Sequence, residues 1–296
     1  MDNCNQQCPR PATSVLLSSL VAEGEAWDEE LAYLNLKMIQ VATSENQHDV
    51  SKENVPDALC NFDRTPQRTE EWWKRRANKM SGSKLANLMF VNNVQELATY
   101  RLEVLGEKPR PPLDEEAMKR VKWGVDHEPD AGATLLHHIP GIQTWEVGFE
   151  MHAQYPWFGS SPDGMVFWPD RFPNNPWGVL EIKCCTKLDK RGKNVPHDGV
   201  PYYYVPQLHA EMACMPMDNP CRWAVFVSWS ASTSKIYVVK FDDNYWNLLW
   251  DMVVDFRAGD VDFYQWKLKR DRVKRASEQI AKSATLVQVV QSCCVK

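Results

Sequence analysis

The sequence lacks three features that would place it in a simple class. No hydrophobic run approaches the ~18 to 20 apolar residues of a membrane-spanning helix, which excludes an integral membrane protein. There is no excess of positive charge, because 34 Lys and Arg against 39 Asp and Glu give a net charge of −5, and this argues against a protein that coats polyanions. No C-x-x-C pattern occurs and the nine cysteines are an odd number, so neither a zinc knuckle nor a secreted disulfide scaffold is indicated.

Targeting signals are also weak. The apolar stretch 12–22 resembles the core of a signal peptide only faintly, because four Ser and Thr residues dilute it. The final Cys-Cys-Val-Lys ends in Lys, which a prenylation motif does not normally use. We therefore expect an intracellular protein whose cysteines are reduced thiols.

The first 62 residues are expected to be a helical appendage and linker, followed by a folded domain at 63–296. The polar stretch 43–57 has no periodicity and is typical of a linker or surface loop. Ahead of it, apolar side chains recur on one face of a predicted helix, a pattern more typical of docking on a core than of binding a partner: Trp27, Leu31, Leu34 and Met38.

The folded domain is predicted to mix helices and strands. Capping residues, periodicity and turn residues predict helices at 69–79, 83–90, 114–139, 202–215, 243–257 and 264–281, and strands at 142–151, 164–168, 178–184, 222–229 and 235–241. We expect a kink or a break near Glu128, because Pro129 follows it inside the long helix. The order of elements predicts a single α/β domain.

The most informative residues lie around two of these strands. Alternate residues of a strand share a face, so Glu181 and Lys183 point the same way while Ile182 points into the core. Asp163 lies at the turn into the preceding strand, and if the two strands pair, Asp163 and Glu181 converge. Their carboxylates, with the backbone carbonyl of Ile182, suit a hard divalent cation, and Lys183 is suited to orient or deprotonate a water.

This pattern resembles the PD-(D/E)XK nuclease superfamily. The sequence has Pro162-Asp163 and, after a gap of 17 residues, Glu181-Ile182-Lys183. Short D…E-x-K matches also arise by chance, and the alternative is an exposed turn Asp followed by an ordinary Glu–Lys strand pair.

Three further segments resemble the YqaJ-like viral recombinase and lambda exonuclease group, in the order found in that group. They are Trp72 to Arg76 with Met80 to Ser83, then Trp123-Gly124 with His127-Glu128-Pro129, and then Tyr202 to His209. Pro206 before Gln207 departs from the pattern, and His209 stands where a second Gln is common; His137, His138, His197 and His209 are expected to be structural.

The resemblance implies a restriction-endonuclease-like α/β core, a central mixed sheet flanked by helices. It also implies an Mg²⁺-dependent (or Mn²⁺-dependent) 5′→3′ exonuclease acting on double-stranded DNA ends in viral or phage-type recombination. One or two ions would be held by Glu128, Asp163, Glu181 and the Ile182 carbonyl, with Lys183 positioning the attacking water. The implied binding residues for a terminal 5′-phosphate are Arg76, Ser83, Ser161 and Gln207.

Several points stay open at this stage. A site-specific or structure-specific endonuclease on the same core, or a non-catalytic DNA-binding module, are the alternatives. By resemblance the protein forms a homotrimer, works with a single-strand annealing protein, and acts in the cytoplasm or nucleus of a host cell. DNA contacts are expected from 74–84 and from the basic segment 267–275, which otherwise is a solvated amphipathic helix.

Overall fold

The computed structural model describes residues 56–109, 111–188, 190–217, 221–259 and 261–294. The predicted helix at 27–38 and most of the predicted linker lie outside these residues. Leu59 and Phe62, just before the expected domain start at 63, are buried in the main hydrophobic core. In the part of the chain that the structure describes, no helix combines the length and apolar character needed to cross a membrane.

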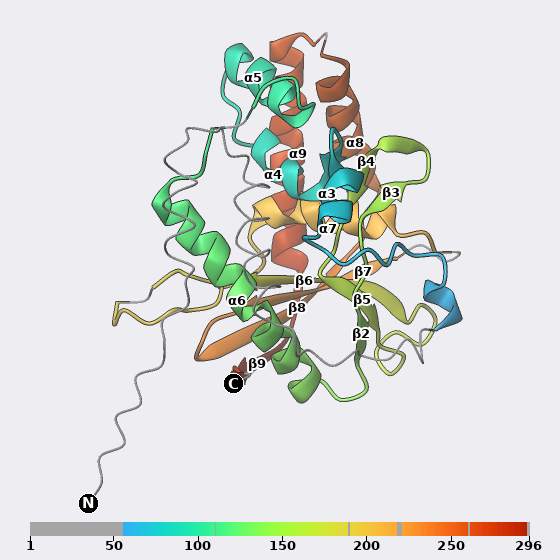
Figure 1. Ribbon diagram of the computed structural model, residues 1–296, viewed down its shortest axis with the longest axis vertical. Coiled ribbons are helices and arrows are strands. Elements are labelled where there is room, and N and C mark those ends of the chain that lie inside the picture. The colour runs from blue at the N-terminus through green and yellow to red at the C-terminus, as the bar shows by residue number, and fades with distance from the viewer. Residues whose placement is uncertain (1–55, 110, 189, 218–220, 260, 295–296) are drawn as a thin grey trace, which may run out of the picture.

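The chain forms a mixed α/β fold, as predicted (Figure 1). Its helical elements are η2 (Asp57–Leu59), α3 (Glu70–Arg76), η3 (Gly82–Lys84), α4 (Leu85–Leu88), α5 (Val94–Val104), α6 (Glu115–His138), η4 (Tyr202–Tyr204), α7 (Val205–Cys214), α8 (Asp243–Ala258) and α9 (Phe263–Ser283). Its strands are β1 (Met80–Ser81), β2 (Gln143–Trp145), β3 (Glu150–His152), β4 (Tyr155–Ser160), β5 (Gly164–Phe167), β6 (Trp177–Cys184), β7 (Trp223–Trp229), β8 (Thr233–Lys240) and β9 (Thr285–Gln291).

The strands make two sheets. The larger has the order β2-β5-β6-β7-β8-β9 and is mixed, because β6 and β7 run parallel while the other neighbours are antiparallel. The smaller has the order β1-β4-β3. The single strand predicted at 142–151 is therefore wrong: β2 joins the large sheet and β3 the small one. The pairing of β4 with β3 and β1, and strand β9, were not predicted.

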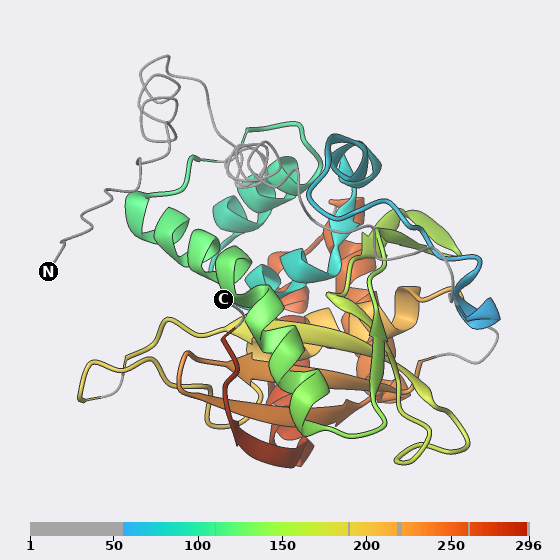
Figure 2. The ribbon, with the colours of Figure 1, turned by 60° about the horizontal axis from the view of Figure 1, so that its bottom comes forward.

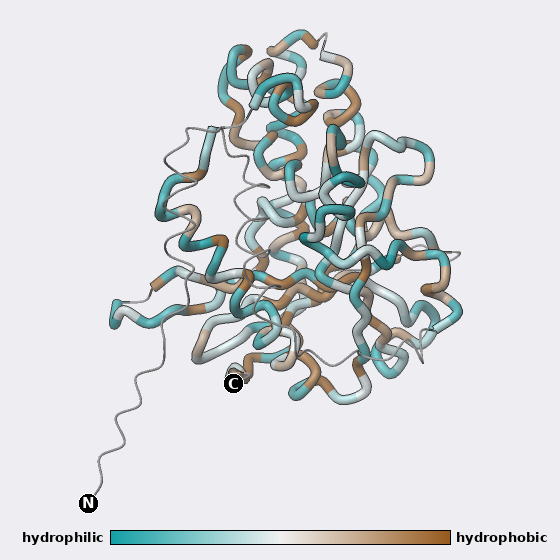
Figure 3. Tube along the Cα trace, viewed as in Figure 1, coloured by the Kyte–Doolittle hydropathy of each residue, from teal (hydrophilic) through white to brown (hydrophobic). Residues whose placement is uncertain are grey.

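Alternation along the central strands creates two cores. Figure 3 shows hydrophobic residues along the strands of the large sheet. Leu180 and Ile182 of β6 pack with Val225 and Val227 of β7 on the face covered by α6. The opposite face carries Val179, together with Ala224 and Phe226, and packs against α7, α8 and α9. Figure 2 shows α6 lying across one side of the large sheet. Even-numbered residues of β6 therefore face α6, and odd-numbered residues face α7, α8 and α9.

Helix α6 continues through Pro129, so of the two alternatives predicted near Glu128, a kink or a break, the break is wrong. Asp114 caps it by accepting a hydrogen bond from the Ala117 N–H, as its position in the sequence predicts. Beyond the proline, Ala131 and Leu135 are fully buried against the sheet. This packing holds the helix together where the missing proline N–H would favour an interruption.

Helix α9, the predicted basic helix, is amphipathic: it packs one face into the hydrophobic core and exposes the other. Trp266 and Val273 are fully buried, and the Arg270 guanidinium donates to the Val91 carbonyl. Some basic residues of α9 form contacts within the fold: Lys269, for example, forms an ion pair with Asp255. The remaining exposed positions on α9 include Lys267, Arg272 and Arg275.

Candidate active site

The predicted pairing of the two motif strands is confirmed. β5 and β6 are antiparallel neighbours with Gly164 opposite Leu180, and the Asp163 N–H donates to the Leu180 carbonyl at 2.9 Å. The Asp163 carboxyl accepts a hydrogen bond from the Ile182 N–H at 2.6 Å. Asp163 is therefore fixed directly against the Glu181–Lys183 segment, where the sequence pattern predicts it.

Glu181 is almost completely buried on the face that α7 covers, and three polar side chains surround it. Lys183, on the same face of β6, forms an ion pair with its carboxylate. The Gln207 amide donates hydrogen bonds to Glu181 Oε1, the oxygen that Lys183 also contacts, at 2.6 Å and to Glu211 Oε1 at 2.8 Å. Because one amide group bridges both acids, α7 positions the carboxylate of Glu181.

Glu128 approaches from the other side of the sheet. It lies on α6, and its carboxylate forms an ion pair with Arg68 in the loop before α3. Burial is the largest influence on the pKa of Asp163 and raises it well above its ordinary value, and the charges of Glu181 and Glu128 raise it further. We call Glu128, Asp163, Glu181 and Glu211 the carboxylate cluster.

The basic side chains balance this concentration of negative charge. Burial opposes the charged form of Lys183, but Glu181, Tyr204 and Asp163 outweigh it and raise the pKa of Lys183 above its ordinary value. The pKa of Arg68 is likewise raised, by Glu128 against the effect of burial. Both side chains are therefore cations that donate hydrogen bonds.

Two members of this site were not predicted. Arg68 has a positive φ of 70°, which is uncommon for a residue with a side chain, and nothing in its neighbouring residues predicts that conformation. Glu211 lies four residues after Gln207 on the same helix face, so an acid at this spacing from a predicted site residue was an available signal. Burial raises the pKa of Glu211 well above its ordinary value, and the Glu181 charge adds to this; its Oε2 atom has no hydrogen-bond partner.

The four predicted phosphate-binding residues fall into two groups. Arg76 Nη2 lies 3.3 Å from Ser81 Oγ, which is 3.1 Å from Ser83 Oγ. The Trp72 indole N–H donates to Ser161 Oγ at 2.9 Å, and the Arg76 guanidinium lies 4.2 Å from the centroid of the Trp72 ring. We call Arg76, Ser81, Ser83 and Ser161 the hydroxyl–arginine cluster.

Gln207 is not part of that cluster through its side chain, because its amide bonds to the two acids. Its backbone is nevertheless close, since a Cβ atom at Gly82 would lie 2.6 Å from Ser160 Oγ and 3.5 Å from the Gln207 carbonyl. Glycine at 82 thus allows η3 to pack tightly between β4 and α7. This close packing brings the hydroxyl–arginine cluster beside the helix that positions Glu181.

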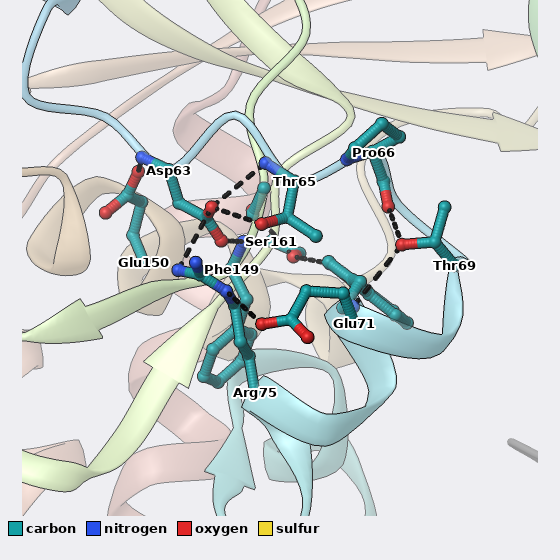
Figure 4. A network of polar contacts seen from close by, with 11 residues as sticks. Asp63, Thr65, Pro66, Thr69, Glu71, Arg75, Phe149, Glu150 and Ser161 are labelled. Atoms are coloured by element: carbon teal, nitrogen blue, oxygen red, sulfur yellow. Dashed lines mark hydrogen bonds and ion pairs between the residues drawn. The ribbon is translucent and has the colours of Figure 1, made fainter.

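The loop before α3 is anchored by a second group of charges (Figure 4). Asp63 accepts hydrogen bonds from the Thr65 N–H at 2.9 Å and the Phe149 N–H at 3.0 Å, and it forms an ion pair with Arg75 at 3.1 Å. The Asp63 N–H donates to Glu150 at 2.6 Å. We call Asp63, Arg75 and Glu150 the loop anchor, and it fixes the loop from which Arg68 reaches Glu128.

The departures from the family pattern have structural explanations. Pro206 lies in the first turn of α7, where a backbone N–H has no helical partner to lose. His209 is buried and bonds to the Val205 carbonyl and the Asp242 N–H, so it joins α7 to the start of α8 and is structural, as expected. The seven cysteines within the described residues are all free thiols.

A metal ion would need a different set of side-chain positions from those seen. Within the described residues, no three His, Cys, Asp or Glu side chains are grouped so that they could hold one. Glu181 and Glu128 are turned toward Lys183 and Arg68, and they come from opposite faces of the sheet. The donors themselves, carboxylates with a backbone carbonyl beside them, are those that hard divalent cations prefer.

The chain is similar in fold to solved nuclease structures. No curated protein matches the chain. Among solved structures, the crystal structure of an alkaline exonuclease (LHK-Exo) from Laribacter hongkongensis is 23% identical, with a TM-score of 0.47 over 72% of this chain and 100% of that chain. LHK-Exo in complex with dAMP gives 24% identity and a TM-score of 0.45 over the same shares.

The family comparison covers the site itself. Residues 71–218, half of the chain, match the family model described as YqaJ-like viral recombinase domain. This range runs from α3 to just beyond α7 and contains Asp163, Glu181 and Lys183, as well as the hydroxyl–arginine cluster. The resemblance seen in separate sequence motifs thus extends over one continuous segment, and the chain belongs to the YqaJ-like viral recombinase domain family.

Proposed function

We propose that this protein is an Mg²⁺-dependent deoxyribonuclease that digests double-stranded DNA from its ends in the 5′→3′ direction, in viral or phage-type recombination. The observation that carries the proposal is the convergence of Asp163, Glu181 and Lys183 at paired strands β5 and β6. Membership of the YqaJ-like viral recombinase domain family supports it.

The carboxylate cluster supports a cation requirement through its charges. Burial raises the pKa of Asp163 and the neighbouring acids raise it further, and the repulsion between the acids is a cost that a divalent cation between them would remove. Asp163, Glu181 and the Ile182 carbonyl would hold the ion, and Glu128 would join them by exchanging Arg68 for it. When bound, such an ion lowers the pKa of a water and neutralises phosphate charge.

The protein side chains would then act as follows. Lys183 is protonated, so it would donate a hydrogen bond to the attacking water or to a phosphate oxygen rather than accept a proton. Gln207 would hold Glu181 in place through the bond already present. Arg68, released from Glu128, would be available to a phosphate oxygen.

The hydroxyl–arginine cluster is the proposed binding site for the terminal 5′-phosphate. A guanidinium and three hydroxyl groups are donors that suit phosphate oxygens. Ser161 is two residues before Asp163, so a phosphate bound there would lie close to the cation and the scissile bond. Because the protein would recognise the end of a strand, it would remove nucleotides from that end.

The test compares four reactions on duplex DNA of one sequence: linear with 5′-phosphate, linear with 5′-hydroxyl, covalently closed circular, and linear with EDTA. We expect rapid loss of the first only. Arg76→Ala should remove the preference for 5′-phosphate, whereas the matched change Arg75→Ala should keep it, because Arg75 contacts Asp63 instead.

Each outcome addresses a different part of the proposal. Equal rates on 5′-phosphate and 5′-hydroxyl ends would exclude the proposed binding site for the terminal 5′-phosphate. Cutting of closed circular DNA would exclude an activity that needs DNA ends. Full activity in EDTA would exclude a requirement for a divalent cation.

A further inference from the structure

A continuous series of aromatic rings leads from the candidate active site to the surface. The Lys183 ammonium lies 5.0 Å from the centroid of the Tyr204 ring, and the Tyr204 and Tyr203 rings are 4.6 Å apart. The Tyr203 and Tyr202 rings are 5.6 Å apart, and both lie 6.4 Å from the Phe90 ring. The series therefore starts at a motif residue and ends at Phe90.

The outer end of this series is unusual in its exposure. Phe90 is 49% exposed, although it is a large apolar side chain, and Tyr202 and Tyr203 are partly exposed beside it. The three rings come from two separate segments, the turn after α4 and the 3₁₀ turn η4, and α4 and η4 both pack against α7. An exposed group of aromatic side chains from separate elements is typical of a binding surface.

The charges around the rings indicate the kind of ligand. On one side, the Lys274 ammonium of α9 lies 5.4 Å from the Tyr202 ring centroid, and α9 packs against η4. On the other side, Phe90 borders a cavity of about 450 Å³ that Glu96 and Glu103 also line. A polyanionic chain would be attracted along the first side and repelled from the second.

We propose that Phe90, Tyr202 and Tyr203 form a stacking platform for unpaired DNA bases, with Lys274 contacting the phosphate backbone of the same strand. Aromatic rings stack on any base, and a nearby cation binds the backbone, which is how single strands are held without sequence preference. The inference rests on the proposed function in one respect: the strand on the platform would be the strand that enters or leaves the nuclease site.

The experiment measures binding and not cleavage, so it stands even if the nuclease proposal fails. The full chain is titrated against a fluorescein-labelled single-stranded oligonucleotide in EDTA, and binding is followed by anisotropy at several salt concentrations. Phe90→Leu keeps apolar bulk without the ring and should weaken binding about five- to a hundredfold. Phe90→Trp restores a ring and should restore binding.

Two further measurements separate stacking from charge. Phe90→Leu should leave the slope of log affinity against log salt unchanged, while Lys274→Ala should reduce it by ~0.7, the value for one phosphate of a single strand. Tyr264→Leu is the matched control, because Tyr264 is 66% exposed on the same helix as Lys274 but about 15 Å further toward its start. It should have no effect.

An oligonucleotide that carries abasic sites tests the base directly. It should bind the unmodified protein at least as weakly as the intact oligonucleotide binds the Phe90→Leu protein, because it loses stacking on all three rings, and Phe90→Leu should weaken it no further. If the Phe90→Leu protein binds intact and abasic strands as the unmodified protein does, the platform does not exist.

Discussion

The carboxylate cluster and the loop anchor both contain buried or half-buried acids, yet their acids are held in different ways. In the loop anchor, both oxygens of Asp63 accept backbone N–H groups, and its side chain is only 7% exposed. In the carboxylate cluster, Glu128 and Glu181 are held mainly by side-chain cations and an amide. Backbone donors cannot leave, whereas side-chain donors can turn away and let a ligand replace them.

This difference separates structural acids from candidate chemical ones. The loop anchor determines where the chain runs, and through the loop it places Arg68 against Glu128. The carboxylate cluster keeps acids close together although their charges oppose one another. The same substitution, made once in each cluster, therefore should have opposite consequences for activity and stability.

The largest effect is expected from Asp163→Asn. The amide oxygen still accepts the Ile182 N–H, so the fold is retained, but a neutral ligand binds a divalent cation poorly. Nuclease activity should fall at least about a hundredfold, while the free energy of unfolding stays the same or rises, since a repelled charge is removed. Activity on linear duplex and urea denaturation measure the two quantities. Near-full Mg²⁺-dependent activity would remove Asp163 from the site.

Asp63→Asn should lower the free energy of unfolding more than it lowers nuclease activity. Both Asp63 oxygens accept backbone N–H groups, and an Asn side chain offers only one acceptor, so its NH₂ group faces a donor. The charge that pairs with Arg75 is lost as well. We expect a loss of about 2 to 4 kcal/mol in the free energy of unfolding. Activity per folded molecule, measured well below the unfolding midpoint, should change far less than in Asp163→Asn; equal stability losses in the two variants would contradict the comparison.

The sequence predicted the carboxylate cluster better than the loop anchor, for a physical reason. Asp163, Glu181 and Lys183 are placed by strand alternation and by one strand pair, both of which are local rules. Asp63 meets Glu150 through a contact between residues 87 positions apart, and no spacing rule relates them. Arg68 depends in turn on that contact and on a backbone conformation that its own residue type disfavours.

The fold shows the same division between local and distant contacts. Caps at Thr69 and Asp114 and the hairpin strands β7 and β8 follow from nearby residues and were predicted. The split of 142–151 between two sheets was not, because β2 pairs with β5 in the large sheet whereas β3 pairs with β4, a strand that was not predicted. A helix that contains Gln207 was predicted, but the partners of the Gln207 side chain were not: they lie on β6 and one turn further along α7.

The smallest effect, on the pH dependence of stability, sharpens the comparison within the loop anchor. Burial, assisted by the charge of Asp63, raises the pKa of Glu150 to about 7, whereas Arg75 lowers it. Between about pH 4.5 and 7 the unfolded chain releases the Glu150 proton and the folded protein keeps it, so stability is greatest below this window and falls as pH rises through it. Glu150→Gln should remove that part of the fall, as measured by urea denaturation at several pH values. Arg75→Met removes a cation that lowers the pKa of Glu150, so it should extend the fall to higher pH. If the unmodified protein and Glu150→Gln show the same slope between pH 4.5 and 7, Glu150 does not titrate in this window, and the loop anchor holds its acids as ions, as the carboxylate cluster would with a cation bound.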